Sequence, residues 1–171
     1  NENYLYGVLI AISVKDTLQK FNAKNIYFKW PNDIFYKNKK FCGIIAESFR
    51  TNSKKNFMVL GFGININNSP QIKNYPTTHV KAFCKFENYY SFVFSFFENF
   101  FDNLNNLLSK KNNLLIEKYK KNLLFFGKKI KIKLHDNSII YGVFKELNSD
   151  GSLLLQQKEK FINIYNGSIV L

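Results

Sequence analysis

The sequence predicts an α+β fold, in which a mixed β-sheet packed by helices is followed by a small β-barrel. Apolar residues recur at helical spacing over residues 4–21 and again over 88–108. Between these two segments lie short extended runs that are broken by turn-forming residues. From Gly127 the apolar period changes to two, the period of a half-buried strand. We therefore expect two domains, residues 1–125 and 126–171.

The composition supports a buried core and argues against a nucleic-acid partner. The 171 residues are 46% hydrophobic and 18% aromatic, enough for one domain with a small satellite. The net charge of +13 would suit a nucleic acid or an anionic membrane. However, Arg50 is the only arginine, and a dedicated DNA reader is expected to place arginine on guanine. We interpret the charge as a lysine-rich composition that can still steer anionic substrates.

The hydropathy, the cysteine count and the N-terminal residues indicate where the protein is located and whether it belongs to a longer chain. No apolar run approaches the ~20 residues of a membrane span, and two cysteines are too few for a disulfide framework. These features predict a cytoplasmic protein with no membrane attachment. The chain starts at Asn1, without a methionine or a signal-peptide pattern, so we expect a piece of a longer protein. His79 and His135 have no partner at metal-ligand spacing.

The first elements are a helix and a three-strand meander. Residues 4–21 place their apolar side chains on or near one stripe, as in an amphipathic helix. Residues 26–49 then read as three strands. The first turn contains Pro31, which fixes φ and removes a donor, followed by two turn formers. The second turn is the polar run 37–40.

Three charged residues stand at the strand ends of this meander. Lys29 ends the first strand, Asp33 begins the second, and Lys40 precedes the third. The meander is therefore expected to set these three residues near the ends of adjacent strands. The alternative is a solvated, lysine-rich hairpin, which is the usual state of such a charge run.

Residues 57–64 predict a fourth strand with bare backbone on one face. Gly61 and Gly63 stand two positions apart and therefore share that face. Glycine in a strand often marks the close approach of a ligand, but a bulge or a tight helix contact explains it equally well. Asn65 ends the strand, where a polar side chain can reach into a site.

The second half of the chain predicts two helices and then only strands. Residues 88–108 have a wide, aromatic face that we expect to form core, and residues 114–124 predict a shorter helix. Five short strands with tight turns follow, a pattern typical of an SH3-like barrel. The predicted strands cover residues 129–134, 139–147, 152–156, 161–165 and 168–171.

Three parts of this sequence, in order and spacing, resemble the catalytic core of biotin protein ligases. They are Lys-Trp-Pro-Asn-Asp at residues 29–33, Lys-x-x-Gly-Ile-Ile-x-Glu at 40–47, and Gly-Phe-Gly-Ile-Asn at 61–65. The strands after Gly127 resemble the SH3-like domain that follows this core in the family. The resemblance covers nearly the whole chain and implies a class II synthetase-like biotin/lipoate ligase core, incomplete at its N-terminus.

The resemblance implies a two-step ligase that uses biotin, ATP and Mg²⁺. The biotin carboxylate attacks the α-phosphate of ATP, giving biotinyl-5'-adenylate, and a lysine of a biotin carboxyl carrier protein then attacks the mixed anhydride. A positioned cation stabilises the negative charge of both steps better in a water-poor site than in bulk water. A homodimer is compatible with this resemblance.

The resemblance also implies roles for particular residues. Lys40 matches the family lysine that meets the biotin carboxyl and the α-phosphate, and Asp33 matches a carboxylate that could orient or deprotonate the incoming lysine. Asn65 matches a residue near the ATP phosphates and Mg²⁺, an ion that prefers hard oxygen ligands. Further biotin- and adenylate-binding positions are Lys29, Trp30, Asn32, Gly43, Ile45, Gly61 and Gly63.

Lys145 is the candidate that the expected barrel contributes. It stands at about the place where the family has a basic residue, usually arginine, that reaches the ATP. A lysine supplies the charge but not the bidentate fork of arginine. Gly142 would let another backbone approach this strand closely, which favours the active interpretation. The alternative is a solvated lysine on an exposed strand, and Lys133 on the neighbouring strand is expected to be inert.

One departure from the family pattern concerns the region before Lys29. The Gly-Arg-Gly-Arg-type loop that covers the adenylate, the Ser/Thr-Asn segment and the winged helix of some relatives do not occur in this sequence. We expect part of a longer or split ligase, or a degenerate enzyme, and the 171-residue chain alone to be a poor catalyst. Two alternatives stay open: a non-catalytic binding module, and a lipoate or octanoate transferase, against which the Lys-Trp-Pro-Asn-Asp motif argues.

Overall fold

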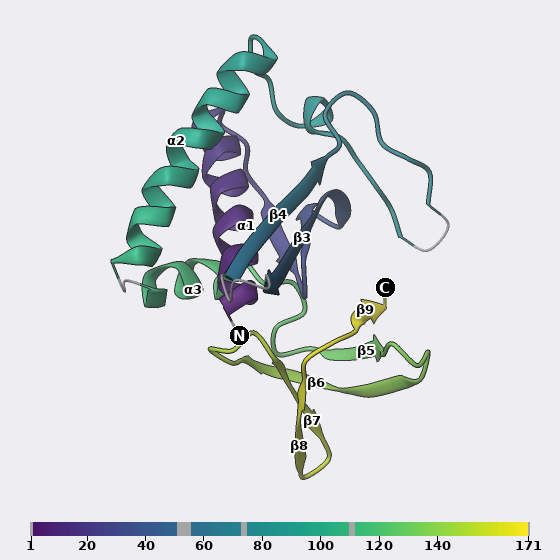
Figure 1. Ribbon diagram of the computed structural model, residues 1–171. Helices are drawn as coiled ribbons and strands as arrows, with labels where there is room; N and C mark the ends of the chain where they lie inside the picture. The colour runs from purple at the N-terminus through teal and green to yellow at the C-terminus, as the bar shows by residue number, and fades with distance from the viewer. Residues whose placement is uncertain (1, 51–55, 73–74, 110–111, 171) are drawn as a thin grey trace.

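The computed structural model describes residues 2–50, 56–72, 75–109 and 112–170 and confirms the predicted α+β class. Helices pack on one sheet, and a second sheet follows them (Figure 1). The elements in chain order are α1 (Glu2–Lys20), β1 (Ile26–Lys29), β2 (Asp33–Tyr36), β3 (Lys39–Arg50), β4 (Asn56–Ile64), the 3-10 helix η1 (Val80–Ala82), α2 (Tyr89–Leu108), α3 (Asn112–Lys120), β5 (Lys129–Lys133), β6 (Ile139–Leu147), β7 (Leu153–Gln157), β8 (Lys160–Ile164) and β9 (Ser168–Val170).

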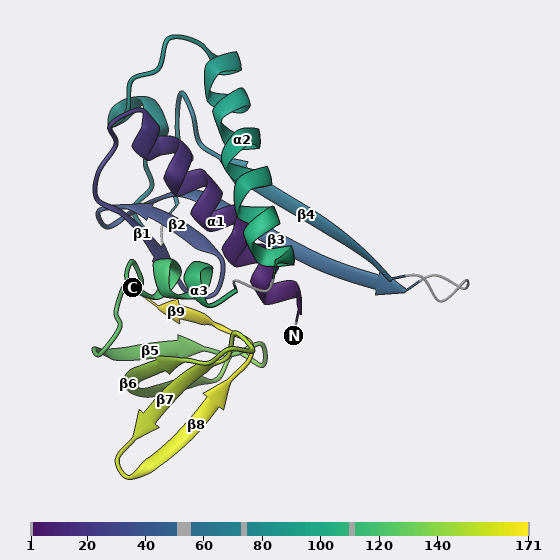
Figure 2. The same ribbon diagram turned by 90° about the vertical axis from the view of Figure 1, so that its left-hand side faces the viewer.

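The N-terminal sheet is the predicted meander extended by a long hairpin. Its strands lie in the order β1-β2-β3-β4, and every neighbouring pair is antiparallel. Parallel pairing occurs in the described residues only at two isolated bridges, Phe28 with Leu123 and Lys40 with Thr77. α1 contacts β3, β4 and α2, and so lies between α2 and the sheet (Figures 1 and 2).

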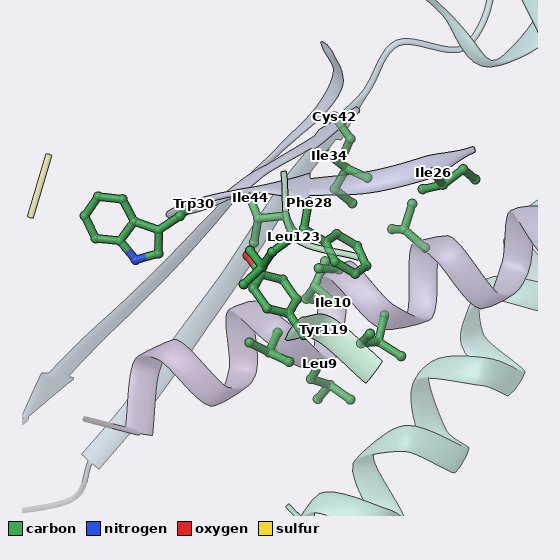
Figure 3. Close-up of a cluster of buried hydrophobic side chains, with 14 of the residues drawn as sticks. Leu9, Ile10, Ile26, Phe28, Trp30, Ile34, Cys42, Ile44, Tyr119 and Leu123 are labelled. Atoms are coloured by element: carbon green, nitrogen blue, oxygen red, sulfur yellow. The ribbon is translucent and has the colours of Figure 1, made fainter. Parts of the chain in front are cut away.

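The centre of α1 is buried on all sides rather than along one stripe. Every residue from Val8 to Val14 is buried, because the sheet covers one face of the helix and α2 and α3 cover others. A helix that is apolar all round is a core helix. Figure 3 shows Leu9 and Ile10 of α1 packed near Phe28 of β1 and Tyr119 of α3.

α2 is confirmed as a helix, and its contact with α1 is partly polar. Asn88 caps it by accepting a hydrogen bond from the backbone N–H of the third residue on. The Asn99 amide donates to Thr17 Oγ1 at 3.1 Å and the Asn103 amide donates to Ser13 Oγ at 3.3 Å, so the packed face is not purely apolar as predicted. Part of the predicted apolar face stays exposed: Tyr89, Val93, Phe97 and Leu108.

α3 ends at Lys120, earlier than the predicted end near Leu124, because the next residues complete the edge of the sheet. The N–H of Phe28 donates to the carbonyl of Asn122 at 2.8 Å, and the N–H of Leu124 donates to the carbonyl of Phe28 at 2.7 Å. These bonds satisfy the outer edge of β1, which would otherwise be an unpaired strand edge.

The second sheet, called the C-terminal sheet below, contains five strands in the order β8-β7-β6-β5-β9. All neighbouring pairs are antiparallel, and the strand bounds agree with the prediction to within one or two residues. A Cβ at Gly142 would lie 2.6 Å from the carbonyl oxygen of Gln156, so the predicted close backbone approach is made by β7 of the same sheet. Among the described residues, no helix is both long enough and apolar enough to cross a membrane.

The two sheets are joined through buried and charged contacts. Trp30, at the turn between β1 and β2, is 1% exposed and donates its indole N–H to the carbonyl of Gly151 at 3.0 Å. Gly151 has φ of +85°, and a Cβ there would lie 2.2 Å from the Tyr4 ring of α1. Lys120 pairs with Glu146 at 2.7 Å. The C-terminal sheet is therefore fixed both to α1 and to the turn between β1 and β2.

Candidate active site

Four residues from four strands form one row across the N-terminal sheet. Lys29 lies opposite Asp33, Asp33 opposite Gly43, and Gly43 opposite Gly63. Paired positions in antiparallel strands present their side chains on the same face. The row therefore has a cation and a carboxylate at one end and bare backbone at the other.

Lys40 joins this row through Asp33. Its Nζ lies 2.5 Å from Asp33 Oδ1, and both side chains are mostly buried, with 23% and 16% of their surface exposed. A Cβ built at Gly43 would lie 3.4 Å from Lys40 Nζ, so the glycine leaves the space in which the ion pair forms. A charge-assisted bond in a partly buried site holds the lysine in one position.

The two lysines differ in how firmly they hold their protons. Burial lowers the pKa of Lys29, the positive charge of Lys40 lowers it further, and Asp33 only partly offsets this. Burial also opposes charge on Lys40, but its hydrogen bond to Asp33 and the charges of Asp33 and Tyr75 outweigh burial and raise the pKa of Lys40. Lys40 is thus the more firmly protonated cation of the pair.

Tyr75 is a site residue that sequence reasoning missed. Its ring centroid lies 5.9 Å from Lys29 Nζ and 5.4 Å from Lys40 Nζ, within cation–π range of both. The loop is held to the strand because the N–H of Lys40 donates to the carbonyl of Pro76 at 2.9 Å. The one signal in the sequence is an aromatic residue directly before Pro76, in a segment without periodic pattern.

Asn32 and Asn65 fix the two ends of the site. The Asn32 amide donates to the carbonyl of Ile44 at 2.7 Å, and the Ile44 N–H donates to the carbonyl of Asn32 at 2.9 Å. The Asn65 amide donates to the carbonyl of Thr78 at 3.2 Å, which leaves its side-chain oxygen as the atom it can offer a ligand. Across the described residues, no three His, Cys, Asp or Glu side chains gather as a metal site would require.

These groups open into a cleft of about 1040 Å³ between the two sheets, to which Pro70, Ile72, Tyr75 and Thr77 also contribute. The C-terminal sheet contributes Lys133, Asn137 and residues of β9 to its wall. Most of the predicted site residues line the cleft: Lys29, Asn32, Asp33, Lys40, Gly43, Ile45, Gly63 and Asn65.

Three predicted site residues are not among those that line the cleft. Trp30 is buried at the joint between the sheets, and Gly61 lies one row further along the β3–β4 hairpin. Lys145 is exposed where the β6–β7 register shifts. Lys133 of β5 was expected to be inert, but it is among the residues that line the cleft.

A protein-family model matches the N-terminal part of the chain, and individual ligases are similar over longer or shorter stretches. Residues 2–65 match the sequence model of the biotin/lipoate A/B protein ligase family. The bifunctional ligase/repressor BirA of Escherichia coli (strain K12) is 32% identical over 60 residues, which are 35% of this chain and 19% of that protein. Biotin–protein ligase 2 of Arabidopsis thaliana is 30% identical over 111 residues, which are 58% of this chain and 32% of that protein. The matches thus span a third or less of these relatives.

The comparison with solved structures extends the likeness of fold to nearly the whole chain. The apo biotin protein ligase of Aquifex aeolicus superposes with a TM-score of 0.80 at 22% identity, covering 98% of this chain and 75% of that one. The same enzyme in complex with biotin and ATP gives a TM-score of 0.78 at 20% identity, covering 97% and 70%. Both sheets and the helices therefore share one arrangement with that fold.

Proposed function

Because residues 2–65 match the sequence model of the biotin/lipoate A/B protein ligase family, we propose that the cleft is the nucleotide-activating site of a biotin–protein ligase. The reaction joins biotin to a lysine of a biotin carboxyl carrier protein by way of biotinyl-5'-adenylate. The observation that carries the proposal is the Lys40–Asp33 pair, with Lys29 beside it, at the wall of the cleft. Lys40 and Lys29 together carry more positive charge than Asp33 neutralises. The remaining positive charge can bind the ATP phosphates and the biotin carboxylate.

In the first step, an oxygen of the biotin carboxylate bonds to the α-phosphorus while the bond to pyrophosphate breaks. Negative charge gathers on the phosphate oxygens as the two anions meet. Lys40 is suited to bind them because its raised pKa keeps it protonated and Asp33 fixes its position. A preorganised charge in a partly buried site is worth more than the same charge in water.

In the second step, the amine of the carrier lysine bonds to the carbonyl carbon of the mixed anhydride, and AMP leaves. Asp33 binds Lys40 through Oδ1, and its other carboxylate oxygen can orient the amine and receive its proton. Biotin and the adenylate would lie along Gly43 and Gly63. A Cβ at Gly63 would meet no atom within 4 Å, so the backbone there is open to a ligand.

Mg²⁺ would bind at this site together with the nucleotide, with the phosphates supplying part of its ligands. Asp33 offers a carboxylate oxygen and Asn65 an amide oxygen to the cleft, and the described residues hold no group of three His, Cys, Asp or Glu side chains that could bind a metal. Mg²⁺ commonly binds through one or two protein oxygens together with substrate phosphates and water. It would neutralise phosphate charge, while Lys40 and Lys29 do so from the protein side.

Acid selectivity tests the proposed function, since a lipoate or octanoate transferase of the same superfamily is the second candidate. We expect biotin to support release of pyrophosphate from ATP, and lipoate and octanoate to support it at least about tenfold less well, a difference of about 1.4 kcal/mol. The measurement is acid-dependent pyrophosphate release at equal acid concentrations. Preference for lipoate or octanoate would assign the site to that candidate.

Lys133 is expected to bind the nucleotide from the C-terminal sheet, because it lines the cleft and Lys145 does not. Lys133→Ala should weaken ATP binding about fivefold, the equivalent of about 1 kcal/mol for one partly exposed charge pair. Lys145→Ala, which removes the same charge from the same sheet, should leave ATP binding unchanged. Calorimetric titration with ATP checks both variants. A larger loss of ATP affinity from Lys145→Ala would mean that Lys145, not Lys133, binds the nucleotide.

A further inference from the structure

A second depression lies on the C-terminal sheet, away from the Lys40–Asp33 pair. It has a volume of about 1390 Å³ and is lined by β5, β6, β9 and the turn that joins β7 to β8. Small-molecule pockets commonly measure about 300–1000 Å³. A segment of polypeptide therefore suits the size of this groove better than one small ligand.

The groove carries positive charge that the chain itself leaves uncompensated. Its lysines are Lys129, Lys131, Lys158 and Lys160, and its one carboxylate is Glu159. In the part of the chain that the structure describes, none of these lysines forms an ion pair. The surface therefore favours a ligand that brings several carboxylates.

Apolar side chains alternate with these lysines across the strands. Lys131 of β5 lies opposite Tyr141 of β6 and also opposite Val170 of β9. Tyr141 is 57% exposed and Val170 is 40% exposed, although both are large apolar residues. Lys129 lies opposite Val143 in the same way. Lys129 and Lys131 thus have apolar neighbours across the sheet, and opposite residues of a sheet share one face.

We propose that this groove binds an acidic segment of a partner protein in which carboxylates alternate with bulky apolar side chains. The carboxylates would meet the lysines, and the apolar side chains would cover Tyr141 and its neighbours. An interface with buried apolar anchors and complementary charge gains both affinity and specificity. This binding site is separate from the proposed ligase chemistry and does not depend on it.

A protein segment explains the groove better than a nucleic acid does. Binding of single strands relies on aromatic rings that are free to stack with bases. Lys131 Nζ already lies 5.7 Å from the Tyr141 ring centroid, within cation–π range, so this ring is not free to stack with a base. Ile169 and Val170 line both the groove and the cleft, so a segment bound here would lie beside the cleft.

Fluorescence anisotropy with a labelled synthetic peptide of alternating Glu and Phe tests the proposal. We expect saturable binding that weakens with salt, and at least about tenfold weaker binding to the double variant Lys131→Glu/Lys158→Glu. The matched control is Lys24→Glu/Lys85→Glu, which changes the net charge equally at exposed positions outside the groove. It should bind the peptide as the unmodified chain does.

Several results would overturn the proposal. They are absence of saturable binding, an equal loss in both double variants, and unchanged binding when Ser replaces every Phe of the peptide. Displacement of the peptide by a single-stranded oligonucleotide that binds more tightly would assign the groove to nucleic acid. Equal thermal unfolding midpoints of the two double variants exclude misfolding as the cause of a loss. Failure of ATP or biotin binding would leave this result unaffected.

Discussion

Lys40→Ala is expected to lower the rate of adenylate formation by about 100- to 1000-fold, equivalent to about 2.7–4 kcal/mol of transition-state stabilisation. The size follows from position. Lys40 is held at 2.5 Å from Asp33 in a partly buried cleft, and its raised pKa keeps the charge in place. The measurement is the biotin-dependent release of pyrophosphate under single-turnover conditions.

The matched control is Lys39→Ala, one position earlier on the same strand. Lys39 is exposed and is not among the cleft-lining residues, so its removal should be within about twofold of the unmodified rate. The two variants remove the same charge from the same strand end. If they lower the rate equally, the lysines act only through general surface charge, and Lys40 is not a catalytic residue.

Gly151→Ala is expected to destabilise the protein by about 2–5 kcal/mol, combining the strain of a positive φ with overpacking of a joint. Gly151 has φ of +85°, and a Cβ there would lie 2.2 Å from Tyr4 Cγ and 2.7 Å from Tyr4 Cβ. A ring attached that closely to the backbone of α1 cannot simply rotate away. The same glycine accepts the Trp30 indole N–H, so its displacement should also disturb the turn before Asp33.

Urea unfolding followed by tryptophan fluorescence measures this effect, because Trp30 is the single tryptophan of the chain. Gly127→Ala is the control: Gly127 has φ of +74°, but a Cβ there would meet no atom within 4 Å. Its cost should be limited to the backbone strain of about 1–3 kcal/mol. Equal costs for the two variants would mean that the contact between α1 and the C-terminal sheet is loose.

The part of the site that lies within one short stretch can be predicted from the sequence. The first turn sets Lys29 opposite Asp33, as the sequence predicts. Lys40 lies opposite Phe35, near the other end of β2, and its long side chain reaches along the strand to Asp33. The spacing of Gly61 and Gly63 predicts bare backbone on β4, and Gly63 does line the cleft. These features depend on local turn chemistry and on the period of the strands.

The parts that depend on packing between distant segments cannot be read from local pattern. A period of two shows that Lys133 and Lys145 both point out of the C-terminal sheet, but not which of them faces the cleft. That choice is set by how the sheet docks on Trp30 and α1. Tyr75 reaches the two lysines from a loop without a periodic signal.

The sequence also gives the wrong burial for helices that pack against more than one other helix or sheet. The sequence of residues 4–21 predicts a single apolar stripe. The centre of α1 is instead buried on all sides, because helices and the sheet both cover it. On α2, Asn99 and Asn103 lie in the contact with α1, where Thr17 and Ser13 accept their hydrogen bonds. Polar residues are acceptable in such a contact once their donors are satisfied.

The most direct test of the proposed site is calorimetric titration with a non-hydrolysable analogue of biotinyl-5'-adenylate, which needs binding and no turnover. We expect saturable binding that Lys40→Ala weakens at least about tenfold and that Lys39→Ala leaves unchanged. Binding of the analogue with the same affinity by both variants, or no binding by the unmodified chain, would contradict the assignment of this cleft to biotin activation.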